Sequence, residues 1–395
     1  MANIVINGHW QPQFDALIER FAQGFNEGEE GAALAVSMEG ERVVDIWAGQ
    51  YRNRQAGIEA NPWQENTLVN VFSAGKGLVA IALMQLVETG QLNLDRPICD
   101  YWPEFTGNDK ELITPRMVLC HRSGLSAFQQ QIPDAAIFDW QAITGYIETE
   151  TPWWTPNTEQ GYSPFMYGWV LGELARRVSG FDSFDQLFQA MIAQPLGVKC
   201  HFGVTDEDLA LIADTQPLRK LPGAPTAPAG ADAQSLGALM KSNPRGVTNR
   251  AFANPLSLMT STNSTQWRRT AIPAAGAHTN ARALASIYGD IASTARLLKA
   301  ETRQLMSQPW TFDADNTLGL PLRFGGGVML SQHDRADCRY GRGEQAFGHP
   351  GAGGSLGFAD CDYRLGFGYV TARMGQSILI DPRATQLIDT LYDCL

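Results

Sequence analysis

The sequence has few cysteines and histidines, and neither residue type forms a binding pattern. Six cysteines are scattered along 395 residues without C-x-x-C spacing, and six histidines show no H-E-x-x-H or other paired spacing. Dispersed cysteines in a chain of this length are typical of reduced, buried thiols in a cytosolic protein. The pattern therefore predicts neither a disulfide framework nor a metal site, and it indicates a cytoplasmic protein.

Positive charge is also scarce, and long apolar runs are missing. The chain has 30 lysines and arginines against 41 aspartates and glutamates, which gives a formal net charge of −11. This balance argues against nucleic acid or an anionic membrane as the main partner. No stretch reaches the roughly 18 apolar residues of a membrane-spanning helix. The N-terminal stretch contains Asp15, Glu19 and Arg20 in an amphipathic pattern, so we expect no signal peptide.

Nucleotide-binding signatures are missing as well, since neither G-x-G-x-x-G nor a Walker pattern precedes a predicted helix. We therefore expect no cofactor. What the chain does have is 44% hydrophobic and only 18% charged residues, which provides enough apolar side chains for a sizeable core. Its length suits two or three average domains or one large two-lobed enzyme.

Strands are predicted near both ends of the chain, with helices between them. A discontinuous α/β sheet lobe is predicted from residues 1–72 and 270–395, and a mostly helical lobe from residues 73–269. Within the helical lobe, proline, glycine and alanine dominate residues 216–246, which predicts an irregular excursion over the surface. Together the two lobes are expected to form one compound domain.

Individual elements follow from spacing and turn residues. Amphipathic spacing with capping residues predicts helices, and short β-rich runs between turn residues predict strands. Residues 51–67 are predicted to be a polar loop. Helices are predicted at 14–25, 164–178, 280–298 and from 384 onward, strands at 325–330, 346–349, 355–361 and 365–371, and a hairpin turn at 38–41.

The most informative stretch runs from Leu68 to Gly90. A short β-type run ends at Phe72, a serine follows, and an apolar segment without proline continues to Gly90. The length of this segment and its terminal glycine predict a helix, and apolar side chains on most of its faces predict that it is buried. Ser73 and Lys76 share one face at its beginning, with Cβ atoms roughly 5–6 Å apart.

This pair has the chemistry of an activated nucleophile. A serine hydroxyl reacts poorly unless a base takes its proton, and free N–H groups at a helix N-terminus stabilise the resulting oxyanion. A lysine in an apolar wall has its ammonium form disfavoured, or lends its charge to another base. The alternative is a capping serine followed by a surface lysine. Against it, Lys76 lies in an apolar helix, and none of the other five lysines has a serine three residues before it.

Two further segments are candidates to complete a site. Tyr162 precedes Ser163 and Pro164, which predict a helix start, so the tyrosine lies on a fixed turn. On its own Tyr162 is better interpreted as a packing residue, and only the upstream Ser73-x-x-Lys76 makes it a candidate base. The run that begins at His349 is either a tight turn or a place where strand N–H groups hold an oxyanion.

Ser355 lies in a G-x-S-x-G sequence, which is the nucleophile elbow of α/β-hydrolases. That elbow requires a strand, the serine and then a helix, with the acid and the histidine following in chain order. No histidine follows His349, and Ser355 leads into a strand-like segment. We therefore interpret Ser355 as the start of a glycine-rich strand and not as the nucleophile.

The order of these elements resembles a known family. Three motifs resemble those of the serine β-lactamase-like hydrolases: Phe72-Ser-Ala-Gly-Lys76, Tyr162-Ser-Pro164 before a helix, and His349-Pro-Gly351 before a glycine-rich strand. The similarity is greatest to the family VIII carboxylesterases, relatives of class C β-lactamases and DD-peptidases, and it covers most of the chain from about residue 14. It implies a β-lactamase/DD-peptidase-like α/β (α+β) fold, with an antiparallel sheet flanked by the terminal helices and an all-helical lobe.

The resemblance also implies roles for the site residues. Ser73 matches the acylated nucleophile, Lys76 its partner, and Tyr162 the tyrosine that acts as general base and acid, kept acidic by Lys76. The N–H groups of Ser73 and Ala352 are the implied oxyanion donors, with a one-residue shift in that loop as the alternative. Which of Lys76 and Tyr162 is the formal base stays open, because coupled groups share their titration.

Departures from the lactamase pattern bear on the substrate. Pro164 stands in place of the asparagine of Tyr-x-Asn, which removes a side-chain amide that would bind a substrate amide. His349, Pro350 and Gly351 stand in place of Lys-Thr-Gly, which removes a fixed positive charge that would bind a substrate carboxylate. The expected lack of a signal peptide is a further departure, and together they disfavour β-lactams and favour neutral esters.

The resemblance thus implies a carboxylesterase that cleaves short-chain neutral esters through a Ser73 acyl-enzyme, with a small-molecule ester as its partner. The alternatives are a β-lactamase, an amide hydrolase or an acyltransferase of the same fold, and a catalytically silent binding protein. The sequence carries no signal for the oligomeric state, the natural substrate or its acyl length.

Overall fold

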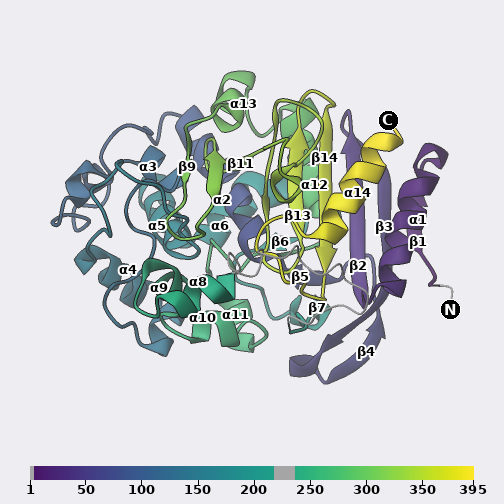
Figure 1. Ribbon diagram of the computed structural model, residues 1–395, viewed down its shortest axis with the longest axis horizontal. Coiled ribbons are helices and arrows are strands. Elements are labelled where there is room, and N and C mark those ends of the chain that lie inside the picture. The colour runs from purple at the N-terminus through teal and green to yellow at the C-terminus, as the bar shows by residue number, and fades with distance from the viewer. Residues whose placement is uncertain (1–3, 218–235) are drawn as a thin grey trace.

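The computed structural model describes residues 4–217 and 236–395. Within these residues, the strands of the larger sheet are β1 (Asn7–Trp10), β2 (Gly31–Met38), β3 (Glu41–Asn53), β4 (Ile58–Pro62), β9 (Thr311–Ala314), β10 (Pro321–Phe324), β11 (Met329–Leu330), β12 (Ala346–Pro350), β13 (Leu356–Asp360) and β14 (Leu365–Thr371). They pair antiparallel in the order β1-β3-β2-β14-β13-β12-β11-β10-β9, with β4 added to β3 (Figure 1). A smaller sheet contains β5 (Leu68–Asn70), β6 (Cys200–His201), β7 (Ile212–Ala213) and β8 (His278–Thr279).

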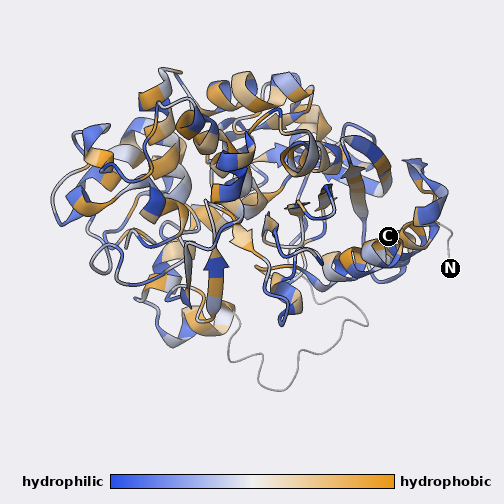
Figure 2. Ribbon diagram, turned by 90° about the horizontal axis from the view of Figure 1, so that it is seen from above, coloured by the Kyte–Doolittle hydropathy of each residue, from blue (hydrophilic) through white to orange (hydrophobic). Residues whose placement is uncertain are grey.

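Helices cover both faces of the larger sheet. α1 (Asp15–Asn26) and α14 (Pro382–Asp393) pack together on one face, and α12 (Ala281–Gly289) packs on the other (Figure 1). Strand β2 serves both cores, because Leu34 and Val36 join the core under the terminal helices and Ala33 and Ala35 join the core on the α12 side. Both terminal helices carry hydrophilic as well as hydrophobic residues, as expected for helices on a surface (Figure 2).

The remaining helices gather on the other side of the molecule, around α2 (Gly75–Glu88) (Figure 1). They are α3 (Pro115–Leu119), α4 (Trp140–Thr149), α5 (Met166–Ser179), α6 (Phe184–Phe188), α7 (Gln194–Leu196), α8 (Leu236–Ser242), α9 (Val247–Ala253), α10 (Ser257–Thr260), α11 (Thr265–Arg269) and α13 (Ala300–Ser307). Among the described residues, none of these helices combines the length and the apolar character that a membrane crossing requires.

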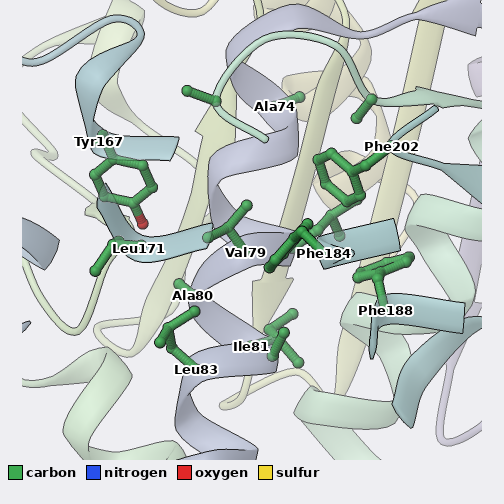
Figure 3. Packing of buried hydrophobic residues seen from close by; sticks show 14 of the residues in the cluster. Ala74, Val79, Ala80, Ile81, Leu83, Tyr167, Leu171, Phe184, Phe188 and Phe202 are labelled. Carbon is green, nitrogen blue, oxygen red and sulfur yellow. The ribbon is translucent and has the colours of Figure 1, made fainter. Parts of the chain in front are cut away.

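Apolar side chains surround the first turns of α2 on all sides. Every residue from 75 to 84 is buried. Tyr167 of α5 lies on one side of the helix, and Phe184, Phe188 and Phe202 lie on the other (Figure 3). The rings of Phe184 and Phe188 each meet the ring of Phe202 edge to face, at centroid separations of 5.0 Å. α2 is therefore fixed in the interior by packing, as its apolar sequence predicts.

Most of the predicted elements are confirmed. The N-terminal helix, the hairpin of β2 and β3, the buried helix α2, the strands β12 to β14 and the C-terminal helix all lie where the sequence predicts them. Gly90, two residues after the end of α2, adopts a φ of +75°, the left-handed conformation expected of a glycine that ends a helix. Local patterns are sufficient for these elements because each has a strong apolar period and a clear stop signal.

Other predictions are wrong in detail. Residues 58–62 form strand β4 and not a loop. The prediction failed because this strand lies at an exposed sheet edge, where its side chains can be polar. Only residues 329 and 330 of the predicted strand at 325–330 are a strand, since the three glycines before them make the turn from β10. α12 ends at residue 289, where a π-helical turn follows, and does not continue to 298.

The proposed division of the chain stays a prediction. The larger sheet takes its strands from residues 7–62 and 311–371, and most of the helices come from the residues between them. Part of the predicted excursion at 216–246, residues 218–235, lies outside the described residues. Residues 236–242 of that stretch form α8, so this part of the predicted irregular segment is helical.

Candidate active site

Ser73 lies on a tight turn between a strand and the buried helix. Residues 72–74 form one 3₁₀ turn, which follows β5 and leads directly into α2. Phe72 has a φ of +47°, which is strained for a bulky residue, and the side chain of Asn70 accepts a hydrogen bond from its N–H (3.1 Å). Gly351 fits against the same turn, because a Cβ there would lie 2.1 Å from the carbonyl oxygen of Val71. The turn that carries Ser73 is therefore fixed by the Asn70 hydrogen bond on one side and by the close packing of Gly351 on the other.

Lys76 is completely buried next to this serine. Its Nζ lies 3.1 Å from Ser73 Oγ, 2.7 Å from the carbonyl oxygen of Pro164 and 3.0 Å from that of Ala274. Burial lowers the pKa of the Lys76 ammonium well below its usual value. The Nζ donates to the carbonyl oxygens of Pro164 and Ala274, and its third contact is with the hydroxyl of Ser73.

Tyr162 lies on residues 160–163, the tyrosine segment, which belongs to no helix and no strand beyond one bridge pair at its start. Hydrogen bonds hold its N–H groups one after another. Gly161 donates to the carbonyl oxygen of His121 (2.9 Å), Tyr162 to Oδ2 of Asp315 (2.7 Å), and Ser163 to Nδ1 of His121 (3.1 Å). The backbone of the tyrosine segment is therefore fixed by polar partners from two distant parts of the chain.

The phenol of Tyr162 faces Lys76 and the histidine rings. The Lys76 Nζ lies 4.9 Å from the centre of the tyrosine ring, and the rings of His121 and His349 lie 4.8 and 6.0 Å from it. Burial raises the pKa of Tyr162, and the nearby Ser73 hydroxyl only partly opposes this. The direction of this shift is opposite to the expectation that Lys76 keeps Tyr162 acidic, because burial favours the protonated phenol.

His349 is buried and neutral. Only 1% of it is exposed, its Nδ1 donates to the carbonyl oxygen of Pro350 (2.9 Å), and its Nε2 has no hydrogen-bond partner within the described residues. Burial, together with the charge of Lys76, lowers the pKa of His349 to about 3. A neutral imidazole here fits the loss of the fixed positive charge that the replacement of Lys-Thr-Gly implies.

The turn after β12 contains two N–H groups that are candidate oxyanion donors, those of Gly351 and Ala352. The N–H of Gly351 donates to the carbonyl oxygen of Ser355 (2.7 Å), so it is not available to a substrate. The N–H groups of Ser73 and Ala352, in contrast, have no hydrogen-bond partner in the described parts of the chain. This favours Ala352 over a one-residue shift.

Ser355 does not lie on a nucleophile elbow. It leads into strand β13 instead of a helix, it is 3% exposed, and its Oγ accepts a hydrogen bond from the N–H of Thr371 (3.4 Å). The interpretation of Ser355 as the start of a strand is confirmed.

Sequence reasoning missed His121, Asp315 and the role of the Pro164 carbonyl. His121 lies two residues after the end of α3, and its φ of +60° gives it an unusual backbone conformation that no local pattern shows. Asp315 lies 153 residues from the tyrosine that it contacts. α5 begins at Met166 and not at Pro164, while the Ser163 side chain accepts from the N–H of Tyr167 (2.9 Å). The carbonyl of Pro164 is thereby left free for Lys76.

Comparisons with known proteins find similar sequences and structures over nearly the whole chain. A family model described as Beta-lactamase matches residues 14–389. The esterase/beta-lactamase LipL of Mycobacterium tuberculosis is 28% identical over 392 residues, which span 95% of this chain and 85% of that protein. A solved family VIII carboxylesterase has a TM-score of 0.87 at 31% identity, covering 99% of this chain and 100% of the other. A penicillin-binding protein homolog from Caulobacter crescentus has a TM-score of 0.86 at 30% identity, with the same coverage. The fold class expected from the sequence is confirmed.

Proposed function

Because the chain belongs to the beta-lactamase family, we propose that it is a carboxylesterase that cleaves short-chain neutral esters through an acyl-enzyme at Ser73. The observation that carries the proposal is the 3.1 Å contact between Lys76 Nζ and Ser73 Oγ, made by a lysine with no exposed surface. A buried lysine beside a serine at a helix start supplies the base that a serine nucleophile needs.

In the proposed acylation step, Lys76 takes the proton of Ser73 as the serine oxygen attacks the ester carbonyl. The carbonyls of Pro164 and Ala274 orient the amine by occupying its N–H groups. Tyr162, whose pKa is raised by burial, then gives its phenolic proton to the leaving alcohol, and the Lys76 ammonium returns a proton to the phenolate. Water hydrolyses the acyl-enzyme by the same groups in reverse.

The proposed oxyanion site consists of the N–H groups of Ser73 and Ala352. Both are unused by the described parts of the protein, and the Ser73 N–H lies at the start of α2, where the helix dipole favours negative charge. Donors placed before the reaction starts stabilise the charge that develops on the carbonyl oxygen without further reorganisation.

The proposed preference for neutral esters rests on the groups around the tyrosine and the β12 turn. A β-lactam carries a carboxylate, which needs a cation or a set of donors. His349 is neutral because its pKa is about 3, and Pro350 has neither a hydroxyl nor an N–H. An unpaired, partly desolvated carboxylate costs on the order of 1–3 kcal/mol.

The names of the relatives support an ester hydrolase and also keep alternatives in view. An esterase/beta-lactamase and a family VIII carboxylesterase are among the proteins most like this chain over its length, and a penicillin-binding protein homolog is similar in structure. The alternatives are a β-lactamase, an amide hydrolase or an acyltransferase, and a silent binding protein. We further propose that the protein acts in the cytoplasm on a small-molecule ester, without nucleic acid or membrane as a partner.

The deciding experiment compares kcat/KM for p-nitrophenyl butyrate and for nitrocefin under one condition. We expect the ester to be the far better substrate of the wild-type protein. The double variant His349→Lys, Pro350→Thr restores the lactamase residue types and should raise nitrocefin acylation more than ester turnover, provided that circular dichroism shows it to be folded. A wild-type protein that prefers nitrocefin would refute the esterase assignment, and one that turns over neither substrate nor reacts with a fluorophosphonate would favour a binding protein.

A further inference from the structure

Asp315 is a buried carboxylate without a cationic partner. It lies in the turn between β9 and β10, with 1% of its surface exposed, and no lysine or arginine pairs with it in residues 4–217 and 236–395. Its two oxygens have different tasks. Oδ1 accepts from the N–H groups of Thr317 (3.0 Å) and Leu318 (2.9 Å) within its own turn, whereas Oδ2 accepts from the N–H of Tyr162 (2.7 Å).

A buried carboxylate costs desolvation free energy that the closing of this turn does not require. Burial raises the pKa of Asp315 to about 6, although the N–H groups of Leu318, Thr317 and Tyr162 all act in the opposite direction. A neutral asparagine oxygen would satisfy the two N–H groups of the turn equally well, without the desolvation of a charge. What only the carboxylate provides is a second acceptor, and that second acceptor is used by Tyr162.

We propose that Asp315 is a positioning residue for the reaction, and that its Oδ2 fixes the backbone of Tyr162 and so places the phenol against Ser73 and Lys76. This inference rests on the proposed function. It assigns a task at Tyr162 to the β9–β10 hairpin, which also bonds to the neighbouring Gln160 through Thr311 and Leu322. The neighbouring N–H groups of Gly161 and Ser163 are held by His121, so loss of the Asp315 contact leaves the rest of the tyrosine segment in place.

The charge of Asp315 supports the same role of Tyr162 as its hydrogen bond does. A negative charge beside Tyr162 raises the pKa of the phenol, in addition to the effect of burial. The proposed mechanism needs Tyr162 as a phenol that donates its proton to the leaving alcohol. Asp315 therefore favours both the position and the protonation state that this step requires.

The test uses Asp315→Asn, which has nearly the same shape. Because both N–H groups of the turn bond to Oδ1, the amide oxygen is expected to stay there, and the NH₂ group then faces the Tyr162 N–H without an acceptor. The matched control is Asp313→Asn in the same hairpin, since Asp313 is half exposed and its carboxylate pairs with Arg122 instead of the Tyr162 N–H. For Asp315→Asn we expect kcat for p-nitrophenyl butyrate to fall about 10- to 100-fold, as small misplacements of catalytic groups do, with KM within about threefold. The control should stay within about twofold on both.

Amide hydrogen exchange gives a readout that does not depend on activity. In Asp315→Asn, but not in Asp313→Asn, the Tyr162 amide should exchange at least about tenfold faster at an almost unchanged melting temperature. If the wild type hydrolyses no ester, the proposed function fails, and the exchange rate alone decides whether Asp315 holds Tyr162. Unchanged kcat and exchange in Asp315→Asn would overturn the proposal. If this variant does not fold, Asp315→Ser takes its place with the same readouts, and failure of both to fold would make Asp315 a folding residue and overturn its positioning role.

Discussion

Ser73 and Lys76 lie at the start of a helix whose position is fixed by apolar packing. Tyr162, in contrast, lies on a segment that is not helical and whose position is fixed by hydrogen bonds. Around α2, side chains such as Leu83 are completely buried, and they stabilise the fold through the apolar area that they remove from water and not through directional contacts. Along the tyrosine segment, His121 and Asp315 each accept from a particular N–H. Packing fixes a helix as one body, while a hydrogen bond fixes one atom. The two halves of the site should therefore fail in different ways.

The difference also separates stability from alignment. Removing apolar atoms around α2 takes away transfer free energy and leaves a cavity, so the whole fold loses stability. Removing one acceptor that binds an N–H of the tyrosine segment changes the direction of a backbone group beside the reacting atoms. The reaction rate should therefore fall while the protein stays folded. Lys76 combines both properties, since it is a buried polar group inside the packed half.

The largest expected effect is at the nucleophile. Ser73→Ala should reduce hydrolysis of p-nitrophenyl butyrate to the background rate, because Ser73 contacts a buried lysine and lies directly before a helix. Ser355→Ala is the matched control and should remain a folded, active protein, since the Ser355 hydroxyl only accepts from Thr371. Residual activity of Ser73→Ala near the wild-type level would break the comparison at its first element.

Lys76→Ala should lower kcat by at least about 10²-fold while the protein stays folded, in the range of general-base effects. Lys110→Ala is the control, because Lys110 is also fully buried and its Nζ donates to the carbonyl oxygen of Glu150 (2.7 Å), away from the serine. Steady-state kinetics with circular dichroism measures both. Activity of Lys76→Ala within a few-fold of wild type would mean that Lys76 only fills space.

A change in the packed half should do the reverse. Leu83→Ala should lower the free energy of unfolding by about 2–5 kcal/mol, because Leu83 is fully buried in the α2 core, while kcat of the folded protein stays within a few-fold. Leu112→Ala is the control, since Leu112 is 55% exposed and should change stability by less than about 0.5 kcal/mol. Urea denaturation gives both values, and a Leu83→Ala protein of unchanged stability but low kcat would contradict the division between packing and alignment.

The smallest expected effect is a pH dependence of stability. Burial lowers the pKa of Lys76 below its usual value of 10.5, so between these two values the unfolded chain binds a proton that the folded protein does not. The lysine therefore adds stability as the pH rises through this interval, and loses it as the pH falls. The melting temperature of Lys76→Met minus that of the wild type should decrease as the pH rises toward the ordinary lysine pKa of 10.5. A difference that does not change with pH below this value would show that Lys76 keeps its proton in the fold.

Much of the packed half could be predicted from the sequence. The helix after Ser73 is apolar on nearly every face and ends at Gly90, and such a pattern is local. The motifs at Tyr162 and His349 could be found because each stands beside a recognisable turn. The contacts of the tyrosine segment could not be predicted, because Asp315 is 153 residues and His121 is 42 residues away from the atoms that they hold.

The edges of the sheet were also beyond local patterns. β4 has mainly exposed, polar side chains, and a strand without a fully buried residue has no apolar period to detect. The pKa of Tyr162 was predicted in the wrong direction for a related reason. A sequence shows that a lysine is near, but the extent of burial, which decides the sign here, depends on the whole fold.

The most direct test of the account is to map the site of covalent reaction. The wild-type protein is treated with a fluorophosphonate, digested, and analysed by peptide mass spectrometry. The account predicts a single adduct on Ser73, lost in Ser73→Ala and formed much more slowly in Lys76→Ala, because the reaction requires the serine that contacts Lys76. An adduct on Ser355, or labelling of Ser73 that proceeds equally fast without Lys76, would contradict it.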